Sequence, residues 1–345
     1  NNTKLMAEQL QQMTGKDDVV FLTGASGFVG SHVLRALLAA QYRVRALVRP
    51  GSSTLPTLEG CTLVRGDVLH PGDLVQYMAG CRYLVHVASL YSFAPGMRRK
   101  MFATNVRSCV GILEAAHQAG IERAVVTSSS STVGPGDEEH PATEEDWDGG
   151  DDSSAYHQSK LLQVRVALAA QLPVVLVLPT APVGPGDWKP TPTGKMVVDF
   201  INGRIFATLG GGLNVVAVED VARAHVLALQ YGRPQERYLV GGENISLSQL
   251  WERLAQICGR TAPRVRIPFP LALTLGWADE LRCQIFRNEA DMATPQIPLE
   301  GVLMARHAMY ASSAKAQAEL GYEATSVTAA LERAVRWYRD NGYGT

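Results

Sequence analysis

The chain is constrained most by residues 19–30, which read VVFLTGASGFVG. An apolar run ends at Gly24, two further glycines follow at three-residue steps, and residues 31–40 are rich in helix formers. This order predicts a buried strand, a tight turn and a helix N-terminus. Glycine lets the turn approach a diphosphate, which the free N–H groups of the first helical turn can bind. Because Gly-x-x-Gly-x-x-Gly also occurs in ordinary turns, the dinucleotide interpretation needs a second strand that carries a ribose-reading residue.

Short apolar runs alternate with helical patterns from residue 19 to about residue 178. Strands are expected at 19–23, 43–49, 62–67, 83–88, 123–127 and 173–178, and helices at 31–40, 73–78, 102–119 and 155–171. The strands are continuously apolar rather than alternating, which is typical of a parallel sheet covered on both faces. We therefore predict an α/β fold with a Rossmann-type doubly wound parallel sheet and a smaller C-terminal substrate-binding subdomain.

A Pro- and Gly-rich stretch at 179–194 marks a change of pattern. Beyond it, helices near 197–202, 221–231 and 247–258 alternate irregularly with strands at 214–218 and 238–240. A Pro-interrupted apolar segment at 265–277 then precedes two C-terminal helical patterns. We predict an N-terminal extension (1–17), an NAD(P)-binding Rossmann domain (18–180) and a mainly substrate-binding subdomain (181–345) that returns some elements to the sheet. An acidic loop at 137–152 is expected to be a solvated surface loop, and its place between two candidate catalytic segments also allows a role at the rim of the site.

Composition excludes several classes of function. A net charge of −1 gives no field for nucleic acid or a membrane surface, and the apolar run 174–178 is too short to span a bilayer. The five cysteines include no Cys-x-x-Cys, and no His-Glu-x-x-His occurs, so we expect reduced thiols and no metal. Residues 1–18 lack the apolar region of a signal peptide. We therefore expect a cytoplasmic protein that acts on a small molecule.

Two residues at strand ends are candidates for cofactor recognition. Arg49 lies 25 positions after Gly24, at the end of the second strand, where NAD-binding folds usually carry an acidic residue. An arginine there can pair with a 2′-phosphate, with Ser52 and Ser53 as further donors and Arg43 and Arg45 nearby. The alternative is a solvated arginine. Asp67 is placed to accept from the adenine amino group, or to cap its own loop.

Tyr156 and Lys160 are four residues apart on one predicted helix, so they share a face. A tyrosine has an ordinary pKa near ~10, and a close ammonium lowers it, which makes the phenol usable in acid–base catalysis. Residues 127–131 read TSSSS at the end of a strand, so they present hydroxyls at the carboxyl edge of the sheet, where ligands bind. Each serine alone fits a turn equally well.

The sequence resembles the extended short-chain dehydrogenases/reductases from about residue 19 to the C-terminus. The matching segments are 23–30 (TGASGFVG), 66–68 (GDV), 86–88 (HVA), 105–106 (NV), 127–129 (TSS), 156–160 (YHQSK), 184–187 (GPGD) and 218–222 (VEDVA). Within that family it is most similar to the dihydroflavonol-4-reductase-like branch, which includes the hopanoid-associated sugar epimerase group. Segments 189–195 (KPTPTGK), 241–244 (GGEN) and 319–322 (ELGY) carry this closer likeness.

The resemblance implies a role for each matching residue. Tyr156 is the expected acid/base, Lys160 holds the nicotinamide ribose and tunes Tyr156, and Ser129 binds the substrate oxygen, with Ser128 and Ser130 as rivals. Asn105 matches an asparagine that supports a proton relay through water. The expected cofactor-binding residues are Gly24, Ser26, Gly27, Phe28, Val29, Gly30, Arg49, Asp67, Val68, Val87, Ala88, Ser89, Tyr156, Lys160, Pro179 and Thr180. A homodimer through the helices that begin near Met101 and Ala155 is also implied.

Three functions remain in view. The first is an NAD(P)H-dependent oxidoreductase that reduces a carbonyl of a small, partly apolar molecule, with NADP(H) preferred and NAD(H) as the alternative. The second is a nucleotide-sugar epimerase or dehydratase with tightly bound NAD, which needs cations to hold a diphosphate; the candidates are Lys189, Lys195, Arg204, Arg282, Arg287 and Arg306. The third is a cofactor-binding regulator without turnover, for which loss of Tyr156 or Lys160 is expected, yet both are present.

Overall fold

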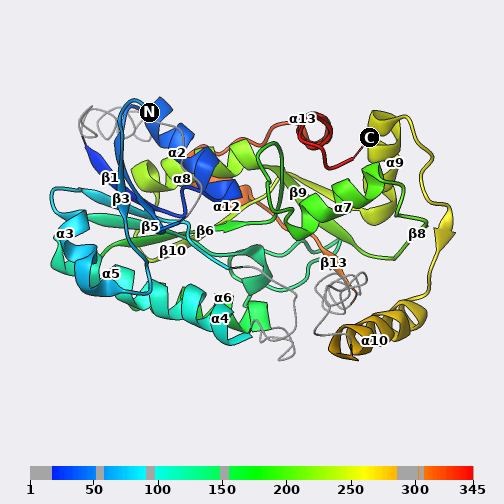
Figure 1. Ribbon diagram of the computed structural model, residues 1–345, viewed down its shortest axis with the longest axis horizontal. Coiled ribbons are helices and arrows are strands. Elements are labelled where there is room, and N and C mark those ends of the chain that lie inside the picture. The colour runs from blue at the N-terminus through cyan, green and yellow to red at the C-terminus, as the bar shows by residue number, and fades with distance from the viewer. Residues whose placement is uncertain are drawn as a thin grey trace.

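The largest sheet is a parallel sheet of seven strands in the order β3-β2-β1-β4-β5-β6-β10. It lies on the left in Figure 1. The computed structural model describes residues 18–51, 58–90, 98–147, 155–285 and 307–344, together with Val302. The strands are β1 (Val19–Thr23), β2 (Arg43–Val48), β3 (Cys61–Arg65), β4 (Tyr83–His86), β5 (Arg123–Thr127), β6 (Val174–Pro179) and β10 (Glu236–Val240). The strand order reverses between β1 and β4, which is where ligands bind in doubly wound sheets. The predicted fold class is confirmed.

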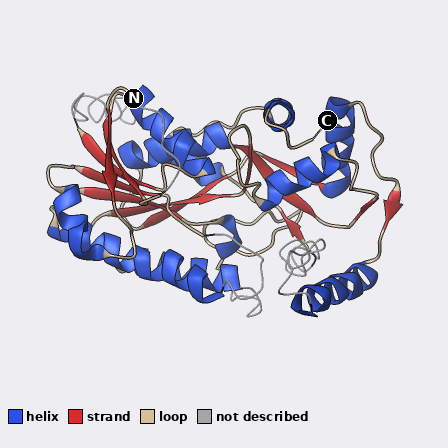
Figure 2. Cartoon of the chain, in the orientation of Figure 1, coloured by secondary structure: helices blue, strands red, loops and turns tan. Residues whose placement is uncertain are grey.

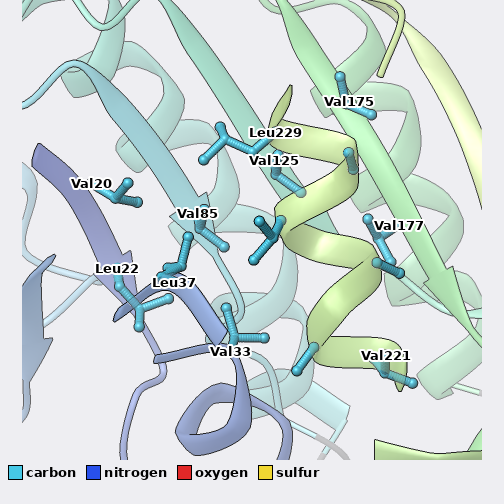
Figure 3. Packing of buried hydrophobic residues seen from close by; sticks show 14 of the residues in the cluster. Val20, Leu22, Val33, Leu37, Val85, Val125, Val175, Val177, Val221 and Leu229 are labelled. Carbon is cyan, nitrogen blue, oxygen red and sulfur yellow. The ribbon is translucent and has the colours of Figure 1, made fainter. Parts of the chain in front are cut away.

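Helices cover both faces of this sheet (Figure 2). One layer holds α2 (Phe28–Ala39), α8 (Val218–Tyr231) and α12 (Ala314–Leu320), and the other holds α3 (Leu74–Met78), α4 (Arg98–Phe102), α5 (Ser108–Gln118) and α6 (Ala155–Leu168). Successive strand residues point to opposite faces, so Val20 and Leu22 join the first layer while Phe21 joins the second. Figure 3 shows the first layer, in which valines of β1, β4, β5 and β6 pack against α2 and α8.

The second half of the chain builds a smaller unit around a third apolar core. Its strands are β7 (Ala181–Val183), β9 (Gly212–Ala217), β11 (Glu243–Ser246) and β13 (Ala308–Met309), with β8 (Ala207–Thr208) and β12 (Val265–Arg266) forming a separate pair. Its helices are α7 (Pro192–Ile201), α9 (Leu247–Cys258), α10 (Phe269–Ile285) and α13 (Val327–Asp340). The same half supplies β10, the outermost strand of the large sheet beside β6. The domain limits 17/18 and 180/181 stay predictions.

The acidic loop is described as far as Trp147, and this part does more than face solvent. Glu144 is buried, and its carboxylate accepts a hydrogen bond of 2.6 Å from the backbone N–H of Leu239 on β10. Ala142 forms a parallel bridge with Ala311. The loop therefore covers the outer edge of β10 and ties it to the C-terminal half. Burial raises the pKa of Glu144, and this hydrogen bond partly offsets the rise.

Two helices differ from their predicted limits for identifiable reasons. The helix expected at 102–119 is interrupted by a π-helical turn, Ala103–Arg107, between α4 and α5. The helix expected at 197–202 begins at Pro192, because the Thr191 hydroxyl accepts from the N–H of Gly194 and proline occupies the first turn. A Thr-Pro start is a recognised N-terminal signal that the sequence reading did not use.

Candidate active site

The turn after β1 is shaped by close backbone packing at two glycines. Gly24 has φ +79°, and a Cβ built on it would lie 2.6 Å from the backbone nitrogen of Ala88. A Cβ on Gly30 would lie 1.9 Å from the carbonyl oxygen of Gly24. The N–H of Gly27 donates to that same oxygen at 2.9 Å, which closes the turn. Gly24 and Gly30 are therefore required by the protein's own packing.

Gly27 is different, because its own surroundings do not demand glycine. Its φ is −86°, and a Cβ there would meet the carbonyl oxygen of Gly24 at 3.3 Å, with no further contact within 4 Å besides its chain neighbours. The first turn of α2 carries no acidic residue and no side-chain cap. Its N–H groups and positive dipole end are thus available to an anion. These features fit the diphosphate of a dinucleotide. Ser26 is exposed in the turn, and Phe28 and Val29 are half-buried at the start of α2.

The recognition residues expected beyond the turn lie at the same edge of the sheet. Arg49 is exposed, one residue beyond β2. Arg45, which sequence reasoning counted as nearby positive charge, donates instead to the backbone oxygens of Tyr77 and Ala79, each at 2.7 Å. Asp67 accepts a hydrogen bond of 2.9 Å from the N–H of Leu69, so in this structure it caps its own loop. Val68 beside it is buried. Ser52 and Ser53 lie outside the described residues.

The end of β4 is held against the glycine turn. The N–H of Val87 donates to the carbonyl of Thr23 at 3.2 Å, and the N–H of Ala88 to its hydroxyl at 3.3 Å. His86 is fully buried and bonds that hydroxyl through Nδ1 at 2.7 Å. Burial, assisted by the charge of Lys160, lowers the pKa of His86 to about 3, so the ring is neutral.

Ser129 is the serine that the structure brings to Tyr156. Tyr156 is the second residue of α6, half-buried, and its phenol hydrogen-bonds the Ser129 side chain. Ser129 has extended backbone (φ −156°, ψ 147°) at the cap of a short 3₁₀ turn, and its Oγ accepts from the N–H and the hydroxyl of Ser131 at 3.2 and 3.0 Å. Ser128, one of the two rivals, is buried, and its hydroxyl has no partner in the described part of the chain.

The amine of Lys160 turns into the protein interior. The side chain is buried, and Nζ donates to Oε1 of Gln163 at 2.9 Å and more weakly to the backbone oxygen of Thr127 at 3.4 Å. Burial lowers the pKa of Lys160 to about 7, with a small opposing contribution from Cys109.

The pKa of Tyr156 does not follow the prediction. Burial raises it to about 12, and the hydrogen bond with Ser129 offsets part of that rise. The prediction that Lys160 lowers this pKa is wrong for this structure, because the amine is directed to Gln163 and Thr127 instead. Tyr156 and Lys160 share one face of α6, as predicted. The direction of the Lys160 side chain, however, determines whether its charge affects the pKa of Tyr156.

Asn105 is fully buried in the π-helical turn and makes four hydrogen bonds with its amide. Nδ2 donates to Ser159 Oγ (3.0 Å) and to the carbonyl of Leu90 (2.9 Å), while Oδ1 accepts from the N–H of Leu90 (2.7 Å) and from Ser89 Oγ (3.0 Å). These bonds use both donors and both acceptor sites of the amide. The side-chain amide is therefore fully occupied, and a water relay at Asn105 stays a prediction. The side chain ties the segment after β4 to α6, beside Tyr156.

The remaining predicted residues, Pro179 and Thr180, lie at the carboxyl end of β6. The Thr180 hydroxyl donates to Oδ1 of Asn214 at 2.8 Å, and its N–H donates to the carbonyl of Val240 at 3.1 Å. Thr180 thus joins the two halves of the chain at the edge of the site. Sequence reasoning missed Asn214, and also Gln163, which helical spacing from Lys160 could have indicated.

Among the described parts of the chain, no group of three or more His, Cys, Asp or Glu side chains could hold a metal ion. Within those parts, too, none of the helices has the length and apolar character to cross a membrane.

Comparison with known proteins decides the family. The model of the NAD dependent epimerase/dehydratase family matches residues 20–241. The chain belongs to this family. The prediction of a nicotinamide-dependent enzyme with the extended short-chain dehydrogenase/reductase fold is thereby confirmed.

Several known proteins match the chain over nearly its whole length. A Synechocystis protein named as a dihydroflavonol 4-reductase is 39% identical, over 94% of this chain and 96% of its own. Sterol demethylase protein B of Methylococcus capsulatus is 31% identical, over 93% and 98%. The crystal structure of gox2253 has a TM-score of 0.81 at 34% identity and covers 95% of this chain and 100% of its own.

Proposed function

We propose that the protein reduces a carbonyl group of a small, partly apolar molecule with NADPH, using Ser129, Tyr156 and Lys160. The observation that carries this proposal is the hydrogen bond between Tyr156 and Ser129 at the carboxyl edge of the sheet. It pairs a proton donor with a second hydroxyl beside the strand ends where a dinucleotide binds.

Reduction needs a proton for the oxygen that the hydride leaves negative. With its pKa raised to about 12, Tyr156 is a weaker acid than an ordinary tyrosine, but it is protonated at neutral pH, and the alkoxide is a strong enough base to take that proton. Ser129 donates a hydrogen bond to the same oxygen and polarises the carbonyl. The bound nicotinamide supplies the hydride. When the cofactor is bound, Lys160 would hold the nicotinamide ribose.

Charge and the names of the relatives support this substrate class. A nucleotide sugar needs cations for its diphosphate, but three of the candidates are paired with carboxylates: Lys195 and Arg204 with Asp199, and Arg282 with Asp279. Lys189 is exposed, and Arg287 and Arg306 lie outside the described residues. The names of two relatives refer to a flavonoid and a sterol, and neither class of compound carries a diphosphate. Epimerisation or dehydration of a nucleotide sugar with tightly bound NAD is the second candidate, supported by the family description.

NADPH is proposed over NADH because Arg49 follows β2 with an exposed cationic side chain where a carboxylate would repel a 2′-phosphate. A homodimer through α4, α5 and α6 is also proposed. Val110 on α5 and Leu162 on α6 are exposed apolar side chains that such an interface would cover.

The test is to denature the purified protein and assay the released nucleotide, and separately to follow NADPH and NADH oxidation against a panel of sterol, flavonoid and alkyl ketones. We expect little retained nucleotide and net NADPH oxidation with at least one carbonyl. Stoichiometric NAD in the denatured protein, with no net oxidation, would favour the epimerase instead.

A further inference from the structure

Gln163 occupies a position that the stability of the fold alone does not explain. It is fully buried on α6, three residues after Lys160, and its Oε1 accepts from Lys160 Nζ at 2.9 Å. Its other amide atom, Nε2, has no hydrogen-bond partner within the described ranges. A buried amide donor without a partner costs free energy, which a leucine or methionine in the same space would avoid. The amide at this position instead provides a hydrogen-bond acceptor for Lys160.

The other groups around Lys160 carry no charge that could replace this bond. Cys109 on α5 is buried, which raises the pKa of its thiol to about 12, so the thiol is neutral. His86 on β4 is neutral as well, since burial lowers its pKa to about 3. The carbonyl of Thr127 on β5 lies farther away, at 3.4 Å. Of these four groups, Gln163 thus offers the strongest hydrogen bond to the ammonium.

We propose that Gln163 is a positioning residue that keeps the Lys160 amine protonated and oriented, and so sets the pH range over which the enzyme binds its nicotinamide cofactor. The inference rests on the role proposed for Lys160 above. Gln163 itself touches neither cofactor nor substrate in this scheme; it acts through the amine.

Two substitutions with opposite electrostatic effects test this. Gln163→Leu removes the acceptor, which disfavours the ammonium, so the pH at which cofactor affinity declines moves down. Loss of one charge-assisted hydrogen bond corresponds to roughly tenfold in proton affinity, or about one pH unit. Gln163→Glu places a carboxylate beside the amine, so the same midpoint moves up. The exposed Gln171, just after α6, provides matched controls as Gln171→Leu and Gln171→Glu.

The measurement is the dissociation constant of NADPH and of NADH, followed by nicotinamide fluorescence from pH 5.5 to 9.5 without any substrate. We expect the wild type and both Gln171 variants to share one midpoint, with the Gln163 variants displaced to either side of it. Midpoints that stay together, or that move in the same direction in both Gln163 variants, would overturn the inference. If the wild type binds neither nucleotide, the proposed function itself fails, which is a different result.

Discussion

Replacing Lys160 with methionine should stabilise the protein while abolishing its activity. Burial lowers the pKa of this lysine from 10.5 to about 7. At about 1.4 kcal/mol per tenfold change in proton affinity, that corresponds to roughly 5 kcal/mol against the charged form. Methionine fills the same linear space without a charge. It also leaves the Gln163 carbonyl without its donor, at about 1–3 kcal/mol, so we expect a net gain of ~2–4 kcal/mol at pH 6.

The dependence on pH gives this prediction its sign. Between pH 7 and 10.5 the unfolded chain still holds a proton that folded Lys160 has released, so wild-type stability rises with pH across that window. The Lys160→Met variant lacks that rise. Its advantage should therefore be largest at or below pH 6 and should shrink by about 3 kcal/mol by pH 9.5.

The assay is urea unfolding of both proteins at pH 6 and pH 9.5, followed by tryptophan fluorescence, with reductase activity measured on the same samples. Other titrating groups, such as Glu144, are common to both proteins and cancel in the difference. An advantage of equal size at the two pH values, or a variant less stable at both, would show that the buried amine does not carry the cost argued above.

Three further predictions concern the turn, the phenol and the cofactor phosphate. Tyr156→Phe should reduce turnover roughly 10²–10⁴-fold while NADPH affinity, read by fluorescence, stays within about twofold, because the proton donor alone is lost; unchanged turnover would remove Tyr156 from the reaction. Gly27→Ala should weaken the binding of both nucleotides with little change in melting temperature. Gly30→Ala should lower the melting temperature sharply, because its Cβ would lie 1.9 Å from the oxygen of Gly24. Equal melting temperatures of the two variants would contradict this difference. Arg49→Ala should weaken NADPH roughly 10- to 100-fold and leave NADH unaffected, as titrations with the two nucleotides can decide.

The large sheet and the nucleotide turn could be predicted because they depend on local patterns. Apolar runs alternating with helices specify a parallel sheet, and glycines between a strand and a helix specify the turn. The strands β7, β8, β11, β12 and β13 were missed, because two to four residues carry no readable periodicity and pairing with distant strands stabilises them.

The sequence predicted which residues form the site better than it predicted their pKa values and hydrogen bonds. Spacing placed Tyr156 and Lys160 on one face of a helix, yet it could not say that the amine would turn to Gln163. Spacing also could not predict that the Asn105 amide would form all its hydrogen bonds with Ser89, Leu90 and Ser159. Both outcomes depend on side-chain directions in a packed interior, which no sequence interval specifies.

The contact between Glu144 and Leu239 has a consequence for how the two halves of the chain depend on each other. The outermost strand of the nucleotide-binding sheet is supplied from beyond residue 230, and a carboxylate from the acidic loop then occupies a backbone donor on its free side. An open strand edge can pair with a strand of another chain. Because the acidic loop covers this edge of β10, it disfavours such pairing. A fragment ending near residue 180 would lack β10. The edge of β6 would then be unpaired, and the Glu144 carboxylate would lose its backbone donor. The nucleotide-binding half is thus completed by the half that follows it.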